Sequence, residues 1–198
     1  MSEEDVAKEI RESDENVQQG KAKYKLYYFD ARGKGEIIRV ALHFLNISFH
    51  DNRIPIDSWG KNKKSRAVAE EKAYFGGKTK LEQARVDMHT AWIFDLLEAL
   101  ARIQMSEVPD NRPEKMKDFG QTTLVHFLDA FSKLIEKQGT FLIGKNFTYL
   151  DCAFITFYKL IKEPFKEQVS NYGLINDYFN RSILLPTLQP YIEAHWTD

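Results

Sequence analysis

The chain has little cysteine, almost no net charge and no long apolar run, and each scarcity excludes a class of protein. A single cysteine among 198 residues rules out an internal disulfide, which is typical of cytosolic proteins. A formal net charge of −1 gives no general attraction to nucleic acid or to an anionic membrane. No stretch approaches the roughly 18 apolar residues of a membrane span, and no apolar leader follows Met1. We therefore expect a cytoplasmic protein with no nucleic-acid or membrane partner.

Metal and nucleotide motifs are missing as well. None of the histidines has the spacing of a metal-binding motif: His43, His50, His89, His126 and His195. Gly33 and Gly35 lack the remainder of a dinucleotide fingerprint and need only serve a turn. The sequence predicts no metal site.

The most informative segment that is present covers residues 24–39. Its first half has the aromatic and apolar residues of a buried strand, and after Gly33 and Gly35 the pattern becomes helical. A junction of this kind gathers backbone N–H groups at the positive end of a helix dipole. We therefore expect the junction to favour an anionic ligand or a thiolate.

The rest of the first half predicts a small β–α–β unit. Residues 1–23 are dense in polar side chains and are expected to be a disordered or weakly helical extension. Ile38, Ala41, Leu42 and Leu45 share one face of the helix that starts near Glu36. Residues 48–54 alternate like a half-exposed strand, and a right-handed crossover would make the two strands parallel.

The second half is helical by pattern, so the fold class is α/β plus all-α. Residues 81–101 predict a long helix that is buried on most sides, and Pro113 can open another that continues to Gly139. Thr148 and Asp151 form a capping box for a helix over residues 149–161. A short helix over residues 166–172 and a last one after Pro186 or Pro190 complete the prediction.

Six short stretches in this order resemble the glutathione transferases, most closely the sigma class that includes the glutathione-dependent prostaglandin D synthases. The matching stretches are residues 24–39, 53–54 with 57–59, 65–69, 80–87, 144–151 and 191–194. The resemblance implies a thioredoxin-like domain at residues 24–77, a helical domain at residues 78–198 and a homodimer. It also implies glutathione as co-substrate, with a small hydrophobic electrophile or lipid as second substrate.

The resemblance assigns a role to two residues of the first segment. Tyr28 matches the catalytic tyrosine, whose hydroxyl donates a hydrogen bond to the sulfur of glutathione and favours the thiolate. Lys34 stands where many sigma-class members have an arginine near the active centre.

Four further residues match glutathione contacts of the family. Trp59 and Lys63 match the residues that hold the glycyl carboxylate, and Ser65 matches the serine that binds the γ-glutamyl carboxylate. Asp95 is the candidate for the acidic residue that reaches glutathione from the partner subunit.

The chain departs from the family between Lys63 and Ser65. Relatives have a cis-proline and two further strands there, whereas this chain has only Lys64 between these residues and no proline between Pro55 and Pro109. The thioredoxin-like domain is therefore expected to be incomplete, with an unpaired sheet edge.

Structural explanations compete with these roles. Tyr28 can be a core aromatic residue, Trp59 can pack on the core, and the lysines of residues 61–64 can form a solvated loop. Cys152 is expected to pack as a small apolar residue of low reactivity. Two functions stay open: a glutathione transferase or isomerase, and a non-catalytic relative that binds ligands or dimerises.

Overall fold

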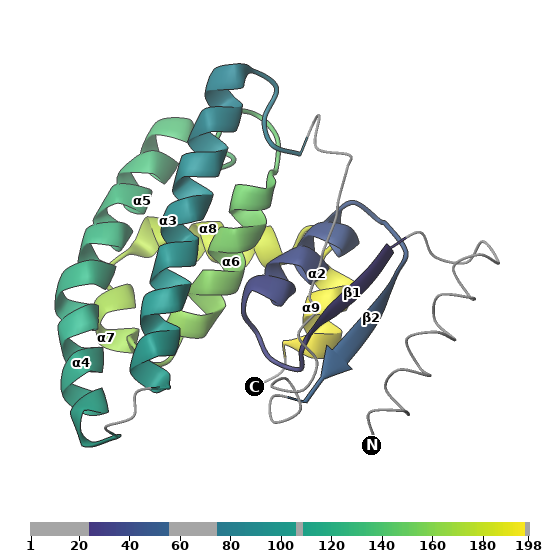
Figure 1. Cartoon of the computed structure of the whole chain (residues 1–198). Coiled ribbons are helices and arrows are strands. Elements are labelled where there is room, and N and C mark those ends of the chain that lie inside the picture. The colour runs from purple at the N-terminus through teal and green to yellow at the C-terminus, as the bar shows by residue number, and fades with distance from the viewer. Residues whose placement is uncertain (1–23, 56–74, 106–108, 197–198) are drawn as a thin grey trace.

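The N-terminal unit is a β–α–β crossover of two parallel strands, as predicted (Figure 1). The computed structural model describes residues 24–55, 75–105 and 109–196. Strand β1 (Tyr24–Phe29) is followed by α2 (Lys34–Phe44) and β2 (Phe49–Ile54). The register runs from Tyr24 opposite Phe49 to Phe29 opposite Ile54. Within the described residues the sheet consists of these two strands. The predicted N-terminal extension lies outside them.

A helical domain follows, which confirms the predicted fold class. Its elements are α3 (Lys80–Gln104), a short 3-10 turn (Pro109–Asn111), α4 (Arg112–Phe119), one π-helical turn (Gly120–Leu124), α5 (Val125–Gln138), α6 (Tyr149–Lys162), α7 (Lys166–Val169), α8 (Gly173–Ile183) and α9 (Gln189–His195). Figure 1 shows α4 and α5 in line beside α3, with α6 between these helices and the N-terminal unit. The domain boundary at residue 77 stays a prediction.

Helix α6 forms the centre of the core. Ten of its residues are buried, among them Cys152, Phe154 and Phe157. The ring of Phe154 stacks on that of Phe131 from α5, with centroids 5.3 Å apart. Cys152 is fully buried in the core, as predicted for a cysteine that packs as an apolar residue, and this burial raises the pKa of its thiol.

The predicted capping box at the start of α6 is present. Asp151 accepts hydrogen bonds from the backbone N–H of Thr148 at 2.6 Å and from that of Leu142 at 3.0 Å. The hydroxyl of Tyr178, from α8, donates to the same carboxylate. The cap therefore joins α6 to the preceding loop and to α8.

The predicted buried face of α2 is wrong. Ile37 and Val40 are buried, together with the charged Glu36 and Arg39, whereas Leu45 of the predicted face is 40% exposed. The helix lies between the sheet and α6, and the side chains of Glu36 and Arg39 point into the protein, where they bind partners from other elements. An apolar pattern could not show this, because it assigns charged residues to solvent.

The helix predicted over residues 166–172 is also only partly correct. Helix α7 stops at Val169, and a new helix, α8, begins at Gly173. The side-chain amide of Asn176 donates to the carbonyls of Val169 and Tyr172, at 3.2 and 3.1 Å, and so holds the turn between the two helices.

Helix α3 has the predicted apolar face but is not buried on most sides. Val86, Ile93 and Leu96 are buried, while Leu81 and Met88 on another face are 64% and 59% exposed. None of the helices in the described part of the chain is long and apolar enough to cross a membrane.

Candidate functional site

Tyr28 lies near the end of β1, on the face of the sheet that α2 covers. Alternate residues of a strand point to the same face, and Leu26, two residues before Tyr28, is only 3% exposed. Tyr28 itself is half-buried. Its side chain therefore points toward the start of α2.

Two glycines allow the ring of Tyr28 to lie against this helix. A Cβ atom at Gly35 would stand 2.2 Å from Cγ of Tyr28, and one at Gly33 would stand 2.9 Å from its hydroxyl oxygen. Contacts this short do not occur for real Cβ atoms. The glycines therefore make room for Tyr28, a role beyond the turn that their sequence context predicts.

The start of α2 offers backbone donors beside the Tyr28 hydroxyl. Gly33 is the N-cap, and within the described residues no side-chain hydrogen bond caps this end of the helix. The N–H groups of the first turn of a helix lack the usual intrahelical partner, although that of Glu36 donates to the Gly33 carbonyl at 3.0 Å. The dipole gives this end a partial positive charge. A hydroxyl donor next to such an end suits a thiolate or another small anion.

A buried arginine supports the turn from inside. Arg39 is fully buried, and its guanidinium carbon lies 6.0 Å from the centre of the Tyr28 ring. Its Nε donates to both carboxylate oxygens of Asp51, at 3.0 and 2.9 Å. Its other nitrogens donate to the carboxylate of Glu36 and to the carbonyl of Phe29, both at 3.2 Å.

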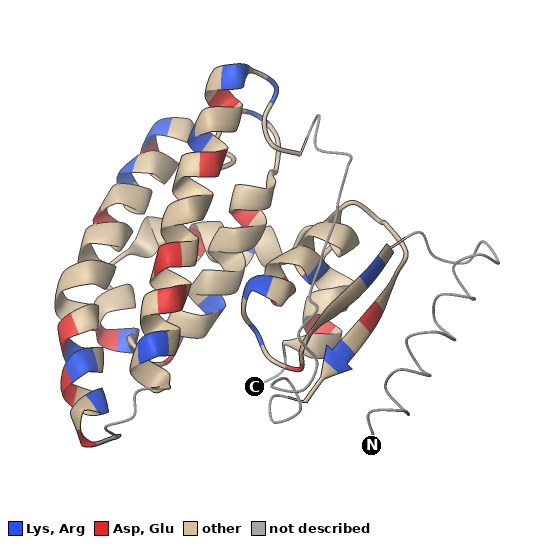
Figure 2. Cartoon of the chain, viewed as in Figure 1, with Lys and Arg blue, Asp and Glu red and all other residues tan. Residues whose placement is uncertain are grey.

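A polar cavity of about 310 Å³ borders the same turn. Asp30, Ala31, Arg32, Glu36, Arg53 and His195 line it. Arg53 donates to Asp30 at 2.9 Å and to Asp51 at 2.8 Å. Burial lowers the pKa of Arg53, but the hydrogen bonds to Asp30 and Asp51 outweigh it and the pKa is raised. The Arg53 charge at this cavity is therefore already paired. Figure 2 shows basic and acidic positions close together on α2, β2 and the turn.

Lys34, the second predicted site residue, reaches across to the helical domain. Its ammonium nitrogen lies 2.5 Å from a carboxylate oxygen of Glu98 and 5.3 Å from the centre of the Phe94 ring, both on α3. The hydrogen bond and the charge of Lys34 lower the pKa of Glu98. Tyr28 and Lys34 both lie at the start of α2, but Lys34 points toward α3 and has a partner, Glu98, that the sequence did not indicate.

Of the other four predicted glutathione contacts, the structure describes only Asp95. Asp95 follows Phe94 on α3 and its side chain is exposed, on the helix that Lys34 contacts. Trp59, Lys63 and Ser65 lie outside the described residues, as does the position of the expected deletion. In the described part of the chain, no group of three His, Cys, Asp or Glu residues is arranged to hold a metal ion.

Sequence reasoning missed the acidic residues that organise the site. Glu36 accepts from the Tyr191 hydroxyl at 2.9 Å and from the Trp196 indole at 2.6 Å. Burial, and then the nearby Glu36 carboxylate, raise the pKa of Tyr191, so the hydroxyl stays a donor. The available signal was the pair Glu36 and Arg39, three residues apart within an apolar helix.

The known proteins that resemble this chain in sequence include glutathione S-transferases. The family described as "Glutathione S-transferase, C-terminal domain" matches residues 94–195. Human glutathione S-transferase A3 is 23% identical over 197 residues, which cover 86% of this chain and 88% of that protein. A probable glutathione S-transferase of Caenorhabditis elegans, gst-36, is 24% identical over 202 residues, covering 85% and 95%.

Solved structures agree on the fold. Prostaglandin synthase D of Nilaparvata lugens has a TM-score of 0.75 at 20% identity and covers 85% of this chain and 96% of its own. The structure of rat hPGDS complexed with a quinoline has a TM-score of 0.75 at 19% identity, covering 88% and 98%. With a family match over more than half of its length and this fold, the chain belongs to the glutathione S-transferase family.

Proposed function

We propose that this protein is a glutathione transferase in which Tyr28 activates the thiol of glutathione. The observation that carries the proposal is the position of the Tyr28 side chain, packed on Gly35 with its hydroxyl next to Gly33 at the N-terminus of α2. Family membership supplies the co-substrate, glutathione. The reaction is conjugation or isomerisation of a small hydrophobic electrophile or lipid, as in the sigma class that the sequence resembles.

The chemistry depends on the thiolate, which is the nucleophilic form of a thiol. A free thiol has a pKa near 8.5, and each unit by which the site lowers it corresponds to about 1.4 kcal/mol. A hydrogen bond from Tyr28 to the sulfur favours the charged form, and the partial positive charge at the start of α2 acts in the same direction.

Glutathione would extend from this turn toward α3 and toward the end of β2. We assign its contacts to Lys34, Trp59, Lys63 and Ser65, with Asp95 contributed by the partner subunit. The second substrate would lie between the turn and α3, where Phe94 offers an apolar surface beside Lys34.

The test is calorimetric titration with glutathione, followed by conjugation of a chloronitrobenzene substrate. Tyr28→Phe keeps the ring but removes the hydroxyl, so we expect a rate at least about tenfold lower, the equivalent of one unit of thiol pKa. Tyr27→Phe is the matched control, because Tyr27 points to the opposite face of β1. Absence of both heat and conjugation with millimolar glutathione would contradict the catalytic proposal. Activity that survives Tyr28→Phe would contradict the assignment of Tyr28.

The alternative is a non-catalytic relative that binds ligands or dimerises. Two observations favour it: the described sheet has only two strands, and the Lys34 cation is already paired with Glu98. The same titration distinguishes the two proposals, since a protein that has lost the glutathione site gives no heat.

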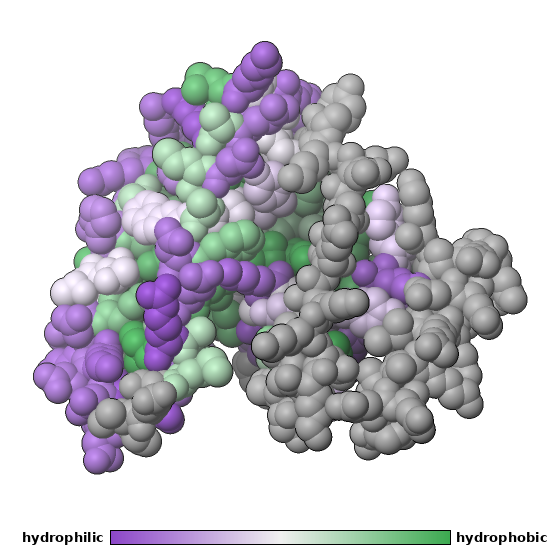
Figure 3. Space-filling view, in the orientation of Figure 1, coloured by the Kyte–Doolittle hydropathy of each residue, from purple (hydrophilic) through white to green (hydrophobic). Residues whose placement is uncertain are grey.

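We also propose a homodimer formed through α3. Leu81, Ala84, Met88 and Ala91 are exposed and follow each other at alternating spacings of three and four residues, which places them in one stripe. Figure 3 shows apolar surface over this part of the molecule between hydrophilic side chains. A second copy of the same helix would cover the stripe.

A further inference from the structure

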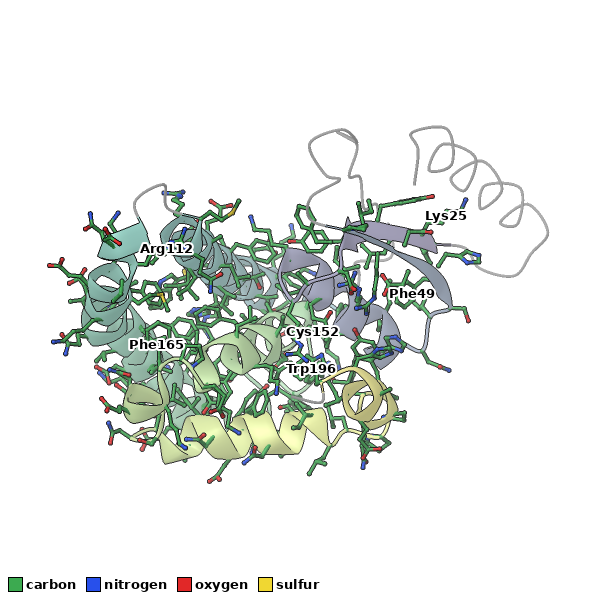
Figure 4. All side chains as sticks on the ribbon, turned by 90° about the horizontal axis from the view of Figure 1, so that it is seen from below. Lys25, Phe49, Arg112, Cys152, Phe165 and Trp196 are labelled. Carbon is green, nitrogen blue, oxygen red and sulfur yellow. The ribbon has the colours of Figure 1, made fainter. Side chains whose placement is uncertain are left out.

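Helix α9 and the residue that follows it contact the N-terminal unit, and a buried carboxylate lies at the centre of this contact. The hydroxyl of Tyr191 and the indole nitrogen of Trp196 both donate to Oε1 of Glu36. The guanidinium of Arg32, in the turn after β1, donates to the carbonyl of His195 at 3.1 Å. Figure 4 shows Trp196 beside α9, below the N-terminal helix.

The other oxygen of Glu36 continues the connection to the turn. It accepts from Nη1 of Arg39, and Nη2 of the same guanidinium donates to the carbonyl of Phe29, the residue after Tyr28. Nη1 also approaches the carbonyl of Ala31, at 3.5 Å. A network of buried and part-buried polar contacts therefore runs from Tyr191 and Trp196 to the carbonyl of Phe29.

The side chains of this hydrogen-bond network have few alternative arrangements. Glu36 is 2% exposed and Arg39 is fully buried. Buried polar groups that lose a partner cannot replace it with bulk water, so the network holds its members in one geometry only while it is complete.

We propose that Tyr191 and Trp196 are positioning residues for Tyr28: they hold Glu36, and through Arg39 they hold the turn that orients the tyrosine hydroxyl. The inference rests on the proposed function, because it concerns the residue that activates the thiol. Misplacement of a catalytic group by about 1 Å can cost about a hundredfold in rate. Loss of the two donors therefore lowers the thiolate fraction although neither residue touches glutathione.

The test uses the double variant Tyr191→Phe/Trp196→Phe. Phenylalanine at position 191 can keep the stacking on His43, where the ring centroids are 4.1 Å apart, and loses only the hydroxyl donor. Trp196→Phe removes the indole donor together with part of a buried ring. The matched control is Tyr172→Phe, which removes another tyrosine–carboxylate hydrogen bond, to Asp129 at 2.7 Å in the helical domain.

Two quantities are measured on folded, full-length protein. The first is the pKa of bound glutathione, from thiolate absorbance against pH. We expect it to rise by about one unit in the double variant, which is a tenfold loss of thiolate at pH values well below the pKa. The second is amide hydrogen exchange of residues 30–36 without ligand, which we expect to become faster. The Tyr172→Phe control should change neither quantity, although it can lower the melting temperature.

The outcomes separate this inference from the proposed function. Unchanged thiol pKa and unchanged exchange in the folded double variant would overturn the positioning role. If the wild type binds no glutathione, the proposed function fails, and the exchange of residues 30–36 alone decides the positioning role: faster exchange supports it and unchanged exchange overturns it. If circular dichroism shows that the double variant is unfolded, Tyr191→Phe alone is subjected to the same two measurements.

Discussion

At the residue scale, Tyr28 and the two glycines of the following turn form one packing unit. The ring has its place because Gly33 and Gly35 have no side chains, and Arg39 lies beneath it. A substitution at Gly35 should therefore affect the chemistry of Tyr28 as well as stability.

Gly35→Ala tests this coupling. The new methyl group would stand 2.2 Å from Cγ of Tyr28, so the ring must move. We expect conjugation to fall as far as in Tyr28→Phe, and the free energy of unfolding to fall by about 1 to 3 kcal/mol, as for other overpacked sites. Gly173→Ala is the control, because a Cβ at Gly173, the first residue of α8, would meet nothing within 4 Å. Equal effects of the two substitutions on conjugation would contradict the packing explanation.

The pair of Lys34 and Glu98 predicts a pH dependence. Lys34 lowers the pKa of Glu98 below its usual value of 4.5, so the pair stabilises the fold above that pH. This contribution is lost as the pH falls through the lowered pKa. Carboxyl carbon NMR should show a pKa below 4.5 for Glu98, and Lys34→Met should raise it toward 4.5. The effect on stability should be small, since both side chains are partly exposed. A titration of Glu98 that is the same in both proteins would show that the pair does not form in solution.

At the scale of elements, capping boxes determine where two of the long helices begin. Thr79 and Glu82 cap α3, and Glu82 also approaches Gly144, whose φ is +70°. Asp151 caps α6 and accepts hydrogen bonds from the preceding loop and from Tyr178. The two caps differ in burial, because the hydrogen bonds of Thr79 are exposed and those of Asp151 are buried.

The difference in burial predicts that removal of each cap lowers the free energy of unfolding by a different amount. Thr79→Ala should lower the free energy of unfolding by about 1 kcal/mol, the usual value for an exposed cap. Asp151→Ala leaves several buried donors without an acceptor, and each such donor costs about 1 to 3 kcal/mol, so we expect a loss of about 3 kcal/mol or more. Urea denaturation measures both. Similar losses in the two variants would mean that the Asp151 site takes up water.

At the scale of the whole molecule, the exposed stripe on α3 predicts an oligomer. Met88→Lys puts a charge in the centre of the proposed interface and should shift the mass seen by light scattering from dimer to monomer. Leu184→Lys is a matched control, because Leu184 is 60% exposed, as Met88 is at 59%, but lies after α8. A wild type that is monomeric at all concentrations, or a dimer that Met88→Lys leaves intact, would contradict this interface.

Contacts between distant segments explain what the sequence could not predict at the site. The strand, the turn and Tyr28 could be recognised because they are consecutive, and Lys34 because it lies in the same motif. Its partner Glu98 is 64 residues away. Residue patterns report on neighbours along a strand or helix, and they contain no information on which distant side chain fills a given contact.

Helix α8 was missed for a local reason. Ile175, Tyr178, Phe179 and Ser182 are buried at helical spacing, so the signal was present. The preceding residues also favoured a helix, and the side-chain amide of Asn176, which holds the turn between α7 and α8, gives no periodic signal.

The sequence by itself determined that a β–α–β unit precedes a helical domain. It also determined most helix positions, the capping box of α6 and the likeness to the glutathione transferases. These follow from propensity, spacing and short motifs, which act over a few residues. The tertiary structure alone decided which face of α2 is buried and that Glu36 is held by residues 155 and 160 positions later. A charged residue is buried only when partners are present for it, and for Glu36 two of those partners come from the other end of the chain.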